Sequence, residues 1–178
     1  MSMAANNKGF TLIENVMAIT LAGFLMLAFS SLLAPTSKQT ADALTQQRAS
    51  QVATWLLQEM YSREFDEVNI HFVERCGSQG VDGCSAILGS DADDTNSVRD
   101  DFDDYDTDGK AISITDFGLD ATGPFRDFLA TVTVRYANDD FEALPKGSAP
   151  TPMKQVTVAI QRGENGKPLV FNAFRSNF

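Results

Sequence analysis

The chain has 178 residues, of which 43% are hydrophobic, and a formal net charge of -10 at pH 7. Its length suits one globular domain with an additional extended segment, and its hydrophobic content excludes a wholly disordered chain. The negative charge argues against a nucleic-acid-binding protein, because phosphate groups would be repelled.

The N-terminal segment has the composition of a membrane helix. Residues 1–9 form a short polar leader in which Lys8 is the only charged side chain, and no charged residue occurs from Asn15 to Pro35. A helix over residues 10–34 would be about 37 Å long, more than the hydrocarbon thickness of about 30 Å that it must cross. We therefore predict a hydrophobic transmembrane helix over residues 10–35.

Two general explanations fit this segment poorly. A secretory signal peptide requires a basic leader and a cleavage site of small residues after the apolar run. This leader has one lysine, residues 30–35 form only a weak cleavage site, and Glu14 places a carboxylate inside the apolar segment. An ordinary single-span anchor explains the length of the segment but not Glu14.

Residues 8–14 read Lys-Gly-Phe-Thr-Leu-Ile-Glu, a string that resembles the prepilin-type cleavage and methylation motif of type IV pilins at every position. The resemblance implies that a prepilin peptidase cuts between Gly9 and Phe10, removing the leader, and that Phe10 is then N-methylated. It also implies that Glu14 pairs with the N-terminal amine of a neighbouring subunit and so sets the axial register. An ionised carboxylate within a bilayer costs about 2.5–3.5 kcal/mol, so a partner for Glu14 is expected. The alternative is that Glu14 lies at the lipid headgroups and only marks the start of the helix.

Lys8 orients the leader toward the cytoplasm, which places the rest of the chain on the other side of the membrane. The resemblance then implies an inner-membrane precursor with a cytoplasmic N-terminus and a periplasmic head, and later a cell-surface pilus. The implied partners are prepilin peptidase, the inner-membrane assembly platform, membrane lipid before assembly, and other major and minor pilins.

Residues 36–63 are predicted to form an amphipathic helix, because apolar residues recur there at helical spacing. Pro35 would either kink one long helix or separate two helices. The two segments together resemble the long N-terminal helix of a pilin, with Trp55 as the large anchor of the buried face. The predicted core side chains of this helix are Ala41, Leu44, Ala49, Val52, Trp55, Leu56 and Met60.

Residues 64–178 are predicted to form the globular head. Cys76 and Cys84 are close enough in sequence for a small disulfide loop, which requires an oxidising compartment. The alternative is two free thiols. Two cysteines are too few for a four-thiolate zinc site, and His71 is the only histidine. His71 has no nucleophile motif to pair with and is interpreted as an ordinary structural histidine, so we predict that the protein is not an enzyme.

An acidic loop over residues 89–120 contains Asp104, Asp106 and Asp108, followed by glycine. Oxygen ligands at alternate positions before a glycine are typical of the first half of a calcium-binding EF-hand loop. The twelfth position would be Thr115 rather than the bidentate glutamate, so the loop is not an EF-hand. Calcium bound by these three aspartates is one prediction, and a solvated acidic loop is the other. No other cofactor is predicted.

The last third of the chain, residues 128–175, is predicted to form an antiparallel sheet. Alternating apolar residues indicate strands at 128–137 and 153–162, a third strand at 168–175, and a short one at 112–114. The order of elements predicts an α+β fold. The resemblance implies a type IV pilin-like architecture, with a long N-terminal helix packed on a C-terminal antiparallel sheet. The side chains expected to face the core are Phe128, Ala130, Val132, Val134 and Tyr136 in the first strand and Val156, Val158 and Ile160 in the second.

Scattered blocks at residues 63–67, 75–77, 84, 88–89 and 99–105 are similar to MSHA-type minor pilins of the D class. This similarity implies a minor pilin that is incorporated into or initiates a filament supporting adhesion, biofilm formation or motility. Two alternatives are a pseudopilin of type II secretion and a membrane-anchored, adhesin-type binding domain.

Overall fold

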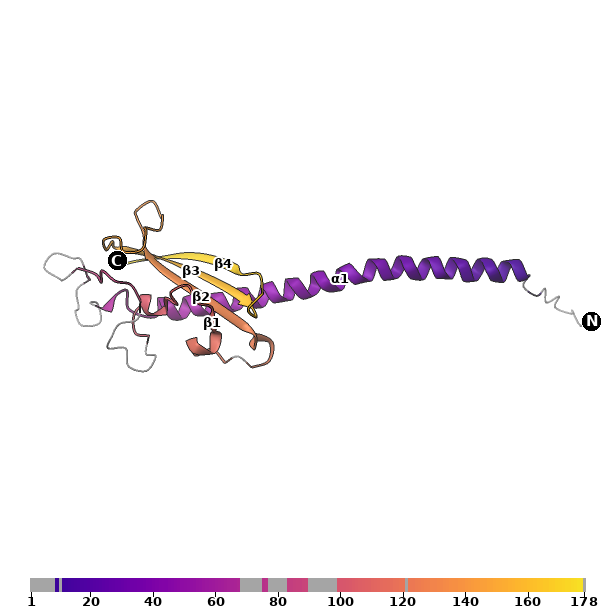
Figure 1. The fold of residues 1–178 in the computed structure, drawn as a ribbon, viewed down its shortest axis with the longest axis horizontal. Coiled ribbons are helices and arrows are strands. Elements are labelled where there is room, and N and C mark those ends of the chain that lie inside the picture. Colours follow the sequence, from indigo (N-terminus) through magenta and orange to yellow (C-terminus); the bar gives the residue numbers. More distant parts are fainter. Residues whose placement is uncertain are drawn as a thin grey trace, which may run out of the picture. The chain divides into compact units, whose positions relative to one another are not determined.

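The computed structural model describes residues 9, 11–67, 75–76, 83–89, 99–120 and 122–177, with the backbone alone for residues 33–38. Lys8, Phe10, His71 and the interior of the Cys76–Cys84 loop lie outside these residues. Within the described ranges, the α-helix and the strands are α1 (Leu12–Tyr61), β1 (Ile112–Ser113), β2 (Phe128–Tyr136), β3 (Met153–Arg162) and β4 (Leu169–Ser176) (Figure 1).

The helix α1 belongs to both of the units into which the chain divides. The first unit is Met1–Leu44 and the second is Thr45–Phe178. The backbone stays helical through Pro35, where the sequence had allowed either a kink or a break between two helices. The second unit contains the last residues of α1 and the whole sheet.

The sheet has the order β1-β2-β3-β4, and each strand is antiparallel to its neighbour. Val134 lies opposite Val156, and Val158 lies opposite Phe171. The predicted strands are confirmed, with ends that differ by at most one residue. The α+β arrangement of a long apolar N-terminal helix and an antiparallel sheet is therefore the observed fold.

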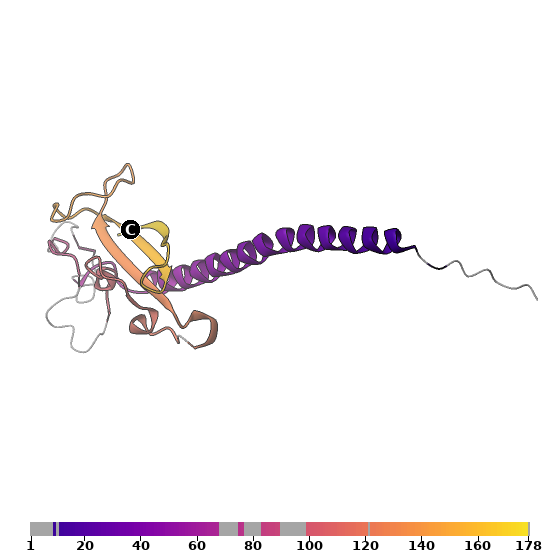
Figure 2. The same cartoon turned by 45° about the vertical axis from the view of Figure 1, so that its right-hand side comes forward.

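The C-terminal part of α1 lies along one face of this sheet (Figure 2). The inward side chains predicted for β2 and β3 are all buried, as strand alternation requires. They pack against one stripe of α1, which supplies Ala49, Val52, Ala53, Leu56 and Met60. This layer of apolar side chains is the core of the second unit.

The helical contribution to the core differs from the prediction at three residues. Ala41 and Leu44 are exposed, because the buried stripe of α1 begins only at Ala49. Trp55 is half-buried and packs at the edge of the core rather than anchoring it. Leu56 and Met60, one turn apart, occupy the centre in its place.

The described part of the acidic segment is solvated only in part: Asp108, Asp116 and Asp120 are exposed, whereas Asp101, Asp103 and Asp104 are buried. It forms short 3-10 turns at Asp103–Tyr105 and Ile114–Phe117. Both turns add buried apolar side chains to the core, and Phe102 beside the first turn is wholly buried. The carboxylates interleaved with these apolar residues are therefore carried into the interior.

Candidate functional site

The start of α1 positions Glu14. The backbone N–H groups of Glu14 and Asn15 donate to the Thr11 carbonyl at 3.1 and 3.2 Å, so the helix begins directly after Thr11. Glu14 therefore lies in the first turn, where the unpaired N–H groups of a helix favour a negative charge. Thr11 and Glu14 also have the Thr-x-x-Glu spacing of a helix-capping pair. Gly9 is exposed, and Phe10 lies outside the described residues.

The segment Leu12–Leu32 is long and apolar enough to cross a membrane, with a mean hydropathy of 2.0 and no buried residue. A cleavable secretory signal can have the same length and composition, so length alone does not identify its role. Its exposed apolar side chains require lipid or neighbouring protein as their surroundings. They include Leu12, Ile13, Val16, Met17, Ile19, Leu21, Phe24, Leu25, Met26, Leu27, Phe29 and Leu32.

Glu14 is the only ionisable side chain in this segment. The Thr20 hydroxyl donates to the Met17 carbonyl at 2.9 Å, and the Ser31 hydroxyl donates to the Ala28 carbonyl at 2.8 Å. These hydroxyl groups are satisfied within the helix, as lipid surroundings demand. The sequence Leu12–Leu32 contains no basic residue that could act as a counter-cation for the Glu14 carboxylate.

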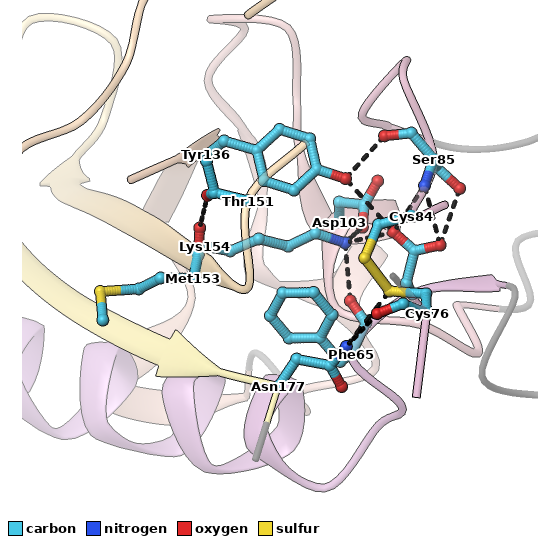
Figure 3. The surroundings of a disulfide bond; sticks show 11 residues. Phe65, Cys76, Cys84, Ser85, Asp103, Tyr136, Thr151, Met153, Lys154 and Asn177 are labelled. Carbon is cyan, nitrogen blue, oxygen red and sulfur yellow. Dashed lines mark hydrogen bonds and ion pairs between the residues drawn. A yellow bond between two sulfur atoms is a disulfide. The ribbon is translucent and has the colours of Figure 1, made fainter. Parts of the chain in front are cut away.

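In the second unit the structure joins Cys76 and Cys84 in a disulfide bond, with their Cα atoms 4.8 Å apart (Figure 3). Both residues are buried. The side-chain amide of Asn177 donates to the Cys76 carbonyl at 3.2 Å, which ties the disulfide to the end of β4. The disulfide thus holds the segment after α1 close to the sheet.

Replacing both Cys76 and Cys84 with Ser should lower the free energy of unfolding by about 2–3 kcal/mol, because a short covalent loop restricts the unfolded chain by that amount. Denaturant unfolding of the full chain in detergent measures the change. Wild-type protein kept reduced should match the Ser variant. Equal stability of the oxidised wild type and the Ser variant would contradict the expectation.

Beside the disulfide, Lys154, Asp103, Tyr136 and the half-buried Ser85 lie close together (Figure 3). With the buried Asp66 they form a group that we call the Lys154 cluster. The Lys154 ammonium donates to the Asp66 carboxylate at 3.0 Å and to the Asp103 carboxylate. Its remaining hydrogen goes to the Phe65 carbonyl at 2.6 Å. The side chains of Lys154 and Asp66 are 0% exposed, so this is an ion pair without access to water.

Each carboxylate in the cluster has backbone donors of its own. Asp66 accepts the backbone N–H of Ser85 at 3.1 Å and the Ser85 hydroxyl at 2.9 Å. Asp103 accepts the backbone N–H of Gly89 at 3.1 Å. The Tyr136 hydroxyl donates to the Ser85 carbonyl at 2.6 Å. One β3 amine therefore gathers three segments that are distant in sequence, and buried ions with this many partners fix one arrangement of the chain.

The sequence contained a signal for this cluster that was missed. In β3, Lys154 lies two residues before Val156 and therefore on the same face of the strand as Val156, Val158 and Ile160. These three residues are predicted to face the core. Strand alternation therefore places the Lys154 side chain inside, where an amine requires carboxylate partners. The identity of those partners was not readable, because Asp66 and Asp103 lie 88 and 51 positions away.

Asp101 is a third buried carboxyl group near the cluster. Burial, followed by the charge of Asp103, raises its pKa from 3.8 to about 8. Its Oδ1 accepts the backbone N–H groups of Asp103 and Asp104 at 2.8 and 3.1 Å. The folded protein therefore retains a proton on Asp101 at pH values where the unfolded chain has lost it.

This raised pKa predicts that stability decreases with pH. Between about pH 4 and pH 8 the unfolded chain binds fewer protons at Asp101 than the folded chain does, so each step upward in pH disfavours folding. Asp101→Asn retains the acceptor oxygen and removes the titration. Between about pH 5 and pH 8, the melting temperature of the variant should fall less than that of the wild type. Identical pH profiles would contradict the prediction.

The three predicted calcium ligands have separate partners. Asp104 accepts two backbone N–H groups from the residues before it, at 3.0 and 3.1 Å. Asp106 accepts the backbone N–H of Val134 at 3.0 Å. Asp108 is exposed and pairs with Lys146 at 2.9 Å. Within the described ranges, the only grouping of metal-ligand atoms joins Asp66 to Cys76 and Cys84, whose sulfur atoms are in the disulfide.

Calcium binding by Asp104, Asp106 and Asp108 stays a prediction. Bound calcium would stabilise the folded state in proportion to its concentration above the dissociation constant. The melting temperature of the full chain is therefore expected to be higher in calcium than in chelator. The same melting temperature in both conditions would contradict calcium binding.

Comparisons with known proteins identify the N-terminal segment. The family model described as the prokaryotic N-terminal methylation motif matches residues 4–30. The match covers Gly9, Phe10 and Glu14 and most of the apolar segment, and it supports a type IV pilin-like or pseudopilin-like protein. Comparisons with curated proteins and with solved structures gave no match.

Proposed function

We propose that this chain is a minor pilin of an MSHA-like type IV pilus. Prepilin peptidase would cut between Gly9 and Phe10, Phe10 would be N-methylated, and the N-terminal helix would then assemble into the filament. The observation that carries the proposal is the methylation-motif match over residues 4–30, which coincides with a wholly exposed apolar helix containing one acid, Glu14.

Glu14 is the residue that gives the assembly step its register. Cleavage creates a new amine at Phe10, four residues before Glu14 and outside the span Leu12–Leu32. A carboxylate in the hydrocarbon costs about 2.5–3.5 kcal/mol on insertion, and a neighbour's amine at the same depth removes much of that cost. A shift of one subunit along the filament axis would separate the Glu14 carboxylate from the neighbour's amine. The ion pair therefore favours one axial register.

The orientation follows from the leader. Lys8 holds the N-terminus in the cytoplasm, so the second unit with its disulfide lies in the periplasm. Before assembly the exposed apolar side chains of Leu12–Leu32 face membrane lipid, and after assembly they face other major and minor pilins. The assembly platform of the inner membrane is the partner that moves the helix from membrane lipid into contact with other pilins.

Cross-linking in native membranes, followed by purification of the processed protein and mass spectrometry of its neighbours, tests this function. Major and minor pilins of a surface filament as neighbours are the expected result. Type II secretion components as neighbours would identify a pseudopilin instead, and the absence of any pilin-like neighbour would leave only a membrane-anchored binding domain.

A further inference from the structure

The Lys154 amine and the Asp66 carboxylate are in contact in an interior from which water is excluded. Nζ lies 3.0 Å from Asp66 Oδ2, and both side chains are 0% exposed. The rings of Phe65 and Tyr136 flank Nζ, with their centroids 4.5 and 5.6 Å away. An amine and a carboxylate held together in dry, aromatic surroundings are the reactants of an amide bond.

We propose that Lys154 and Asp66 condense to form an intramolecular amide bond, a covalent site that goes beyond the proposed function. The bond from Nζ to Cγ of Asp66 forms, and the bond from Cγ to one carboxylate oxygen breaks. Of the three hydrogens on the ammonium group, one remains on the amide nitrogen. The other two leave with the oxygen as water, so the step needs no oxidant, metal or cofactor.

The hydrogen bonds on Asp66 distinguish its two oxygens. Oδ1 accepts the Ser85 hydroxyl at 2.9 Å, whereas the backbone N–H of Ser85 lies 3.1 Å from both oxygens. These donors are placed to stabilise negative charge on Oδ1 while Cγ is tetrahedral. Oδ2 faces Nζ and receives its hydrogens, which makes Oδ2 the oxygen that departs as water.

The other contacts of Nζ hold the amine in place. The Phe65 carbonyl accepts one hydrogen at 2.6 Å, and Asp103 accepts another. Asp103 is itself fixed by the backbone N–H of Gly89 at 3.1 Å. Asp103 is therefore a positioning residue that keeps Nζ against Asp66, and such fixed approach greatly increases the rate of a reaction between two groups.

Burial favours the amide over the ion pair. Two charges removed from water carry a desolvation penalty, and condensation eliminates those of Lys154 and Asp66. Burial raises the pKa of Asp103, so this carboxyl group takes up a proton when its cation is lost. The water that is formed leaves a site that it cannot readily re-enter, because both side chains are inaccessible. In an assembled subunit the bond would resist separation of the end of α1 from β3 under tension, since Asp66 follows α1 closely.

Mass spectrometry of the full chain, purified in detergent, reduced and denatured, tests the proposal. With the N-terminus determined in the same sample, the mass should be lower than the sequence requires by one water molecule. Trypsin should release a linked pair of peptides, residues 64–75 joined to residues 147–162, with no cleavage after Lys154.

The chain provides its own control, because Lys146 and Asp108 form an exposed ion pair at 2.9 Å. Lys146 should remain a free lysine that trypsin cuts. The matched variant Lys154→Arg keeps the positive charge but should not form the amide, so its full mass is expected. The wild-type measurement decides alone if this variant does not fold.

Two results would overturn the proposal. One is a wild-type chain of full mass with normal cleavage after Lys154, which means that the ion pair persists. The other is the loss of water with the link located between Lys154 and residues 100–110, which contain Asp103. That result would remove Asp66 as the acyl partner.

Discussion

Glu14→Ala is expected to leave a protein that is inserted and processed normally but is absent from the assembled filament fraction. The variant keeps Gly9 and every apolar side chain of the span Leu12–Leu32, so cleavage and membrane insertion should proceed as in the wild type. It removes the only carboxylate that can meet the Phe10 amine of a neighbouring subunit. Without this pair the helix can adopt several axial positions, and no single register is favoured.

The matched control is Asn15→Ala, which changes the adjacent exposed polar residue without changing the charge. Quantitative blotting of sheared filaments and of membranes compares the two variants with the wild type. Asn15→Ala should be incorporated like the wild type, and Glu14→Ala should fall to background in filaments while accumulating in membranes. Normal incorporation of Glu14→Ala would assign Glu14 to the helix start alone.

Lys154→Met is expected to destabilise the second unit by about 3–5 kcal/mol, the cost of removing one partner from a buried ion pair. The side chains of Asp66 and Asp103 are 0% and 3% exposed, so both carboxylates would be left in the interior without their cation. A covalent bond between Lys154 and Asp66 would add to the loss. Denaturant unfolding of the full chain in detergent measures the effect.

Two further variants show whether the loss arises from buried charge. Lys146→Met removes an exposed ion-pair partner of similar size and should change stability little. Replacing Asp66 and Asp103 with Asn in the Lys154→Met background removes the unpaired charges and should recover part of the stability. A Lys154→Met protein as stable as the Lys146→Met protein would show that the cluster does not stabilise the fold.

Much of the fold was predictable because it depends on local periodicity. The strands β2, β3 and β4 follow from alternating apolar residues, and their predicted ends lie within one residue of those observed. The apolar span Leu12–Leu32 follows from composition alone. The methylation motif was readable for a similar reason, since the motif and Glu14, the residue proposed for assembly, occupy one short string.

Properties that depend on tertiary contacts were not predictable. Helical spacing placed Leu44 and Trp55 on the core face, but only packing against the sheet decides where the buried stripe begins and which side chain lies at its centre. The acidic residues suggested a solvated loop or a metal site. Asp103 is instead buried because Phe102 beside it fills the core and because Lys154, distant in sequence, pairs with it.

The most direct test of the whole account is the N-terminal sequence and methylation state of the protein isolated from native membranes. We expect one mature form that begins with N-methylated Phe10, with Glu14 as its fifth residue. A mature chain that begins after residue 30, or that retains Gly9, would contradict assembly through a paired amine and carboxylate.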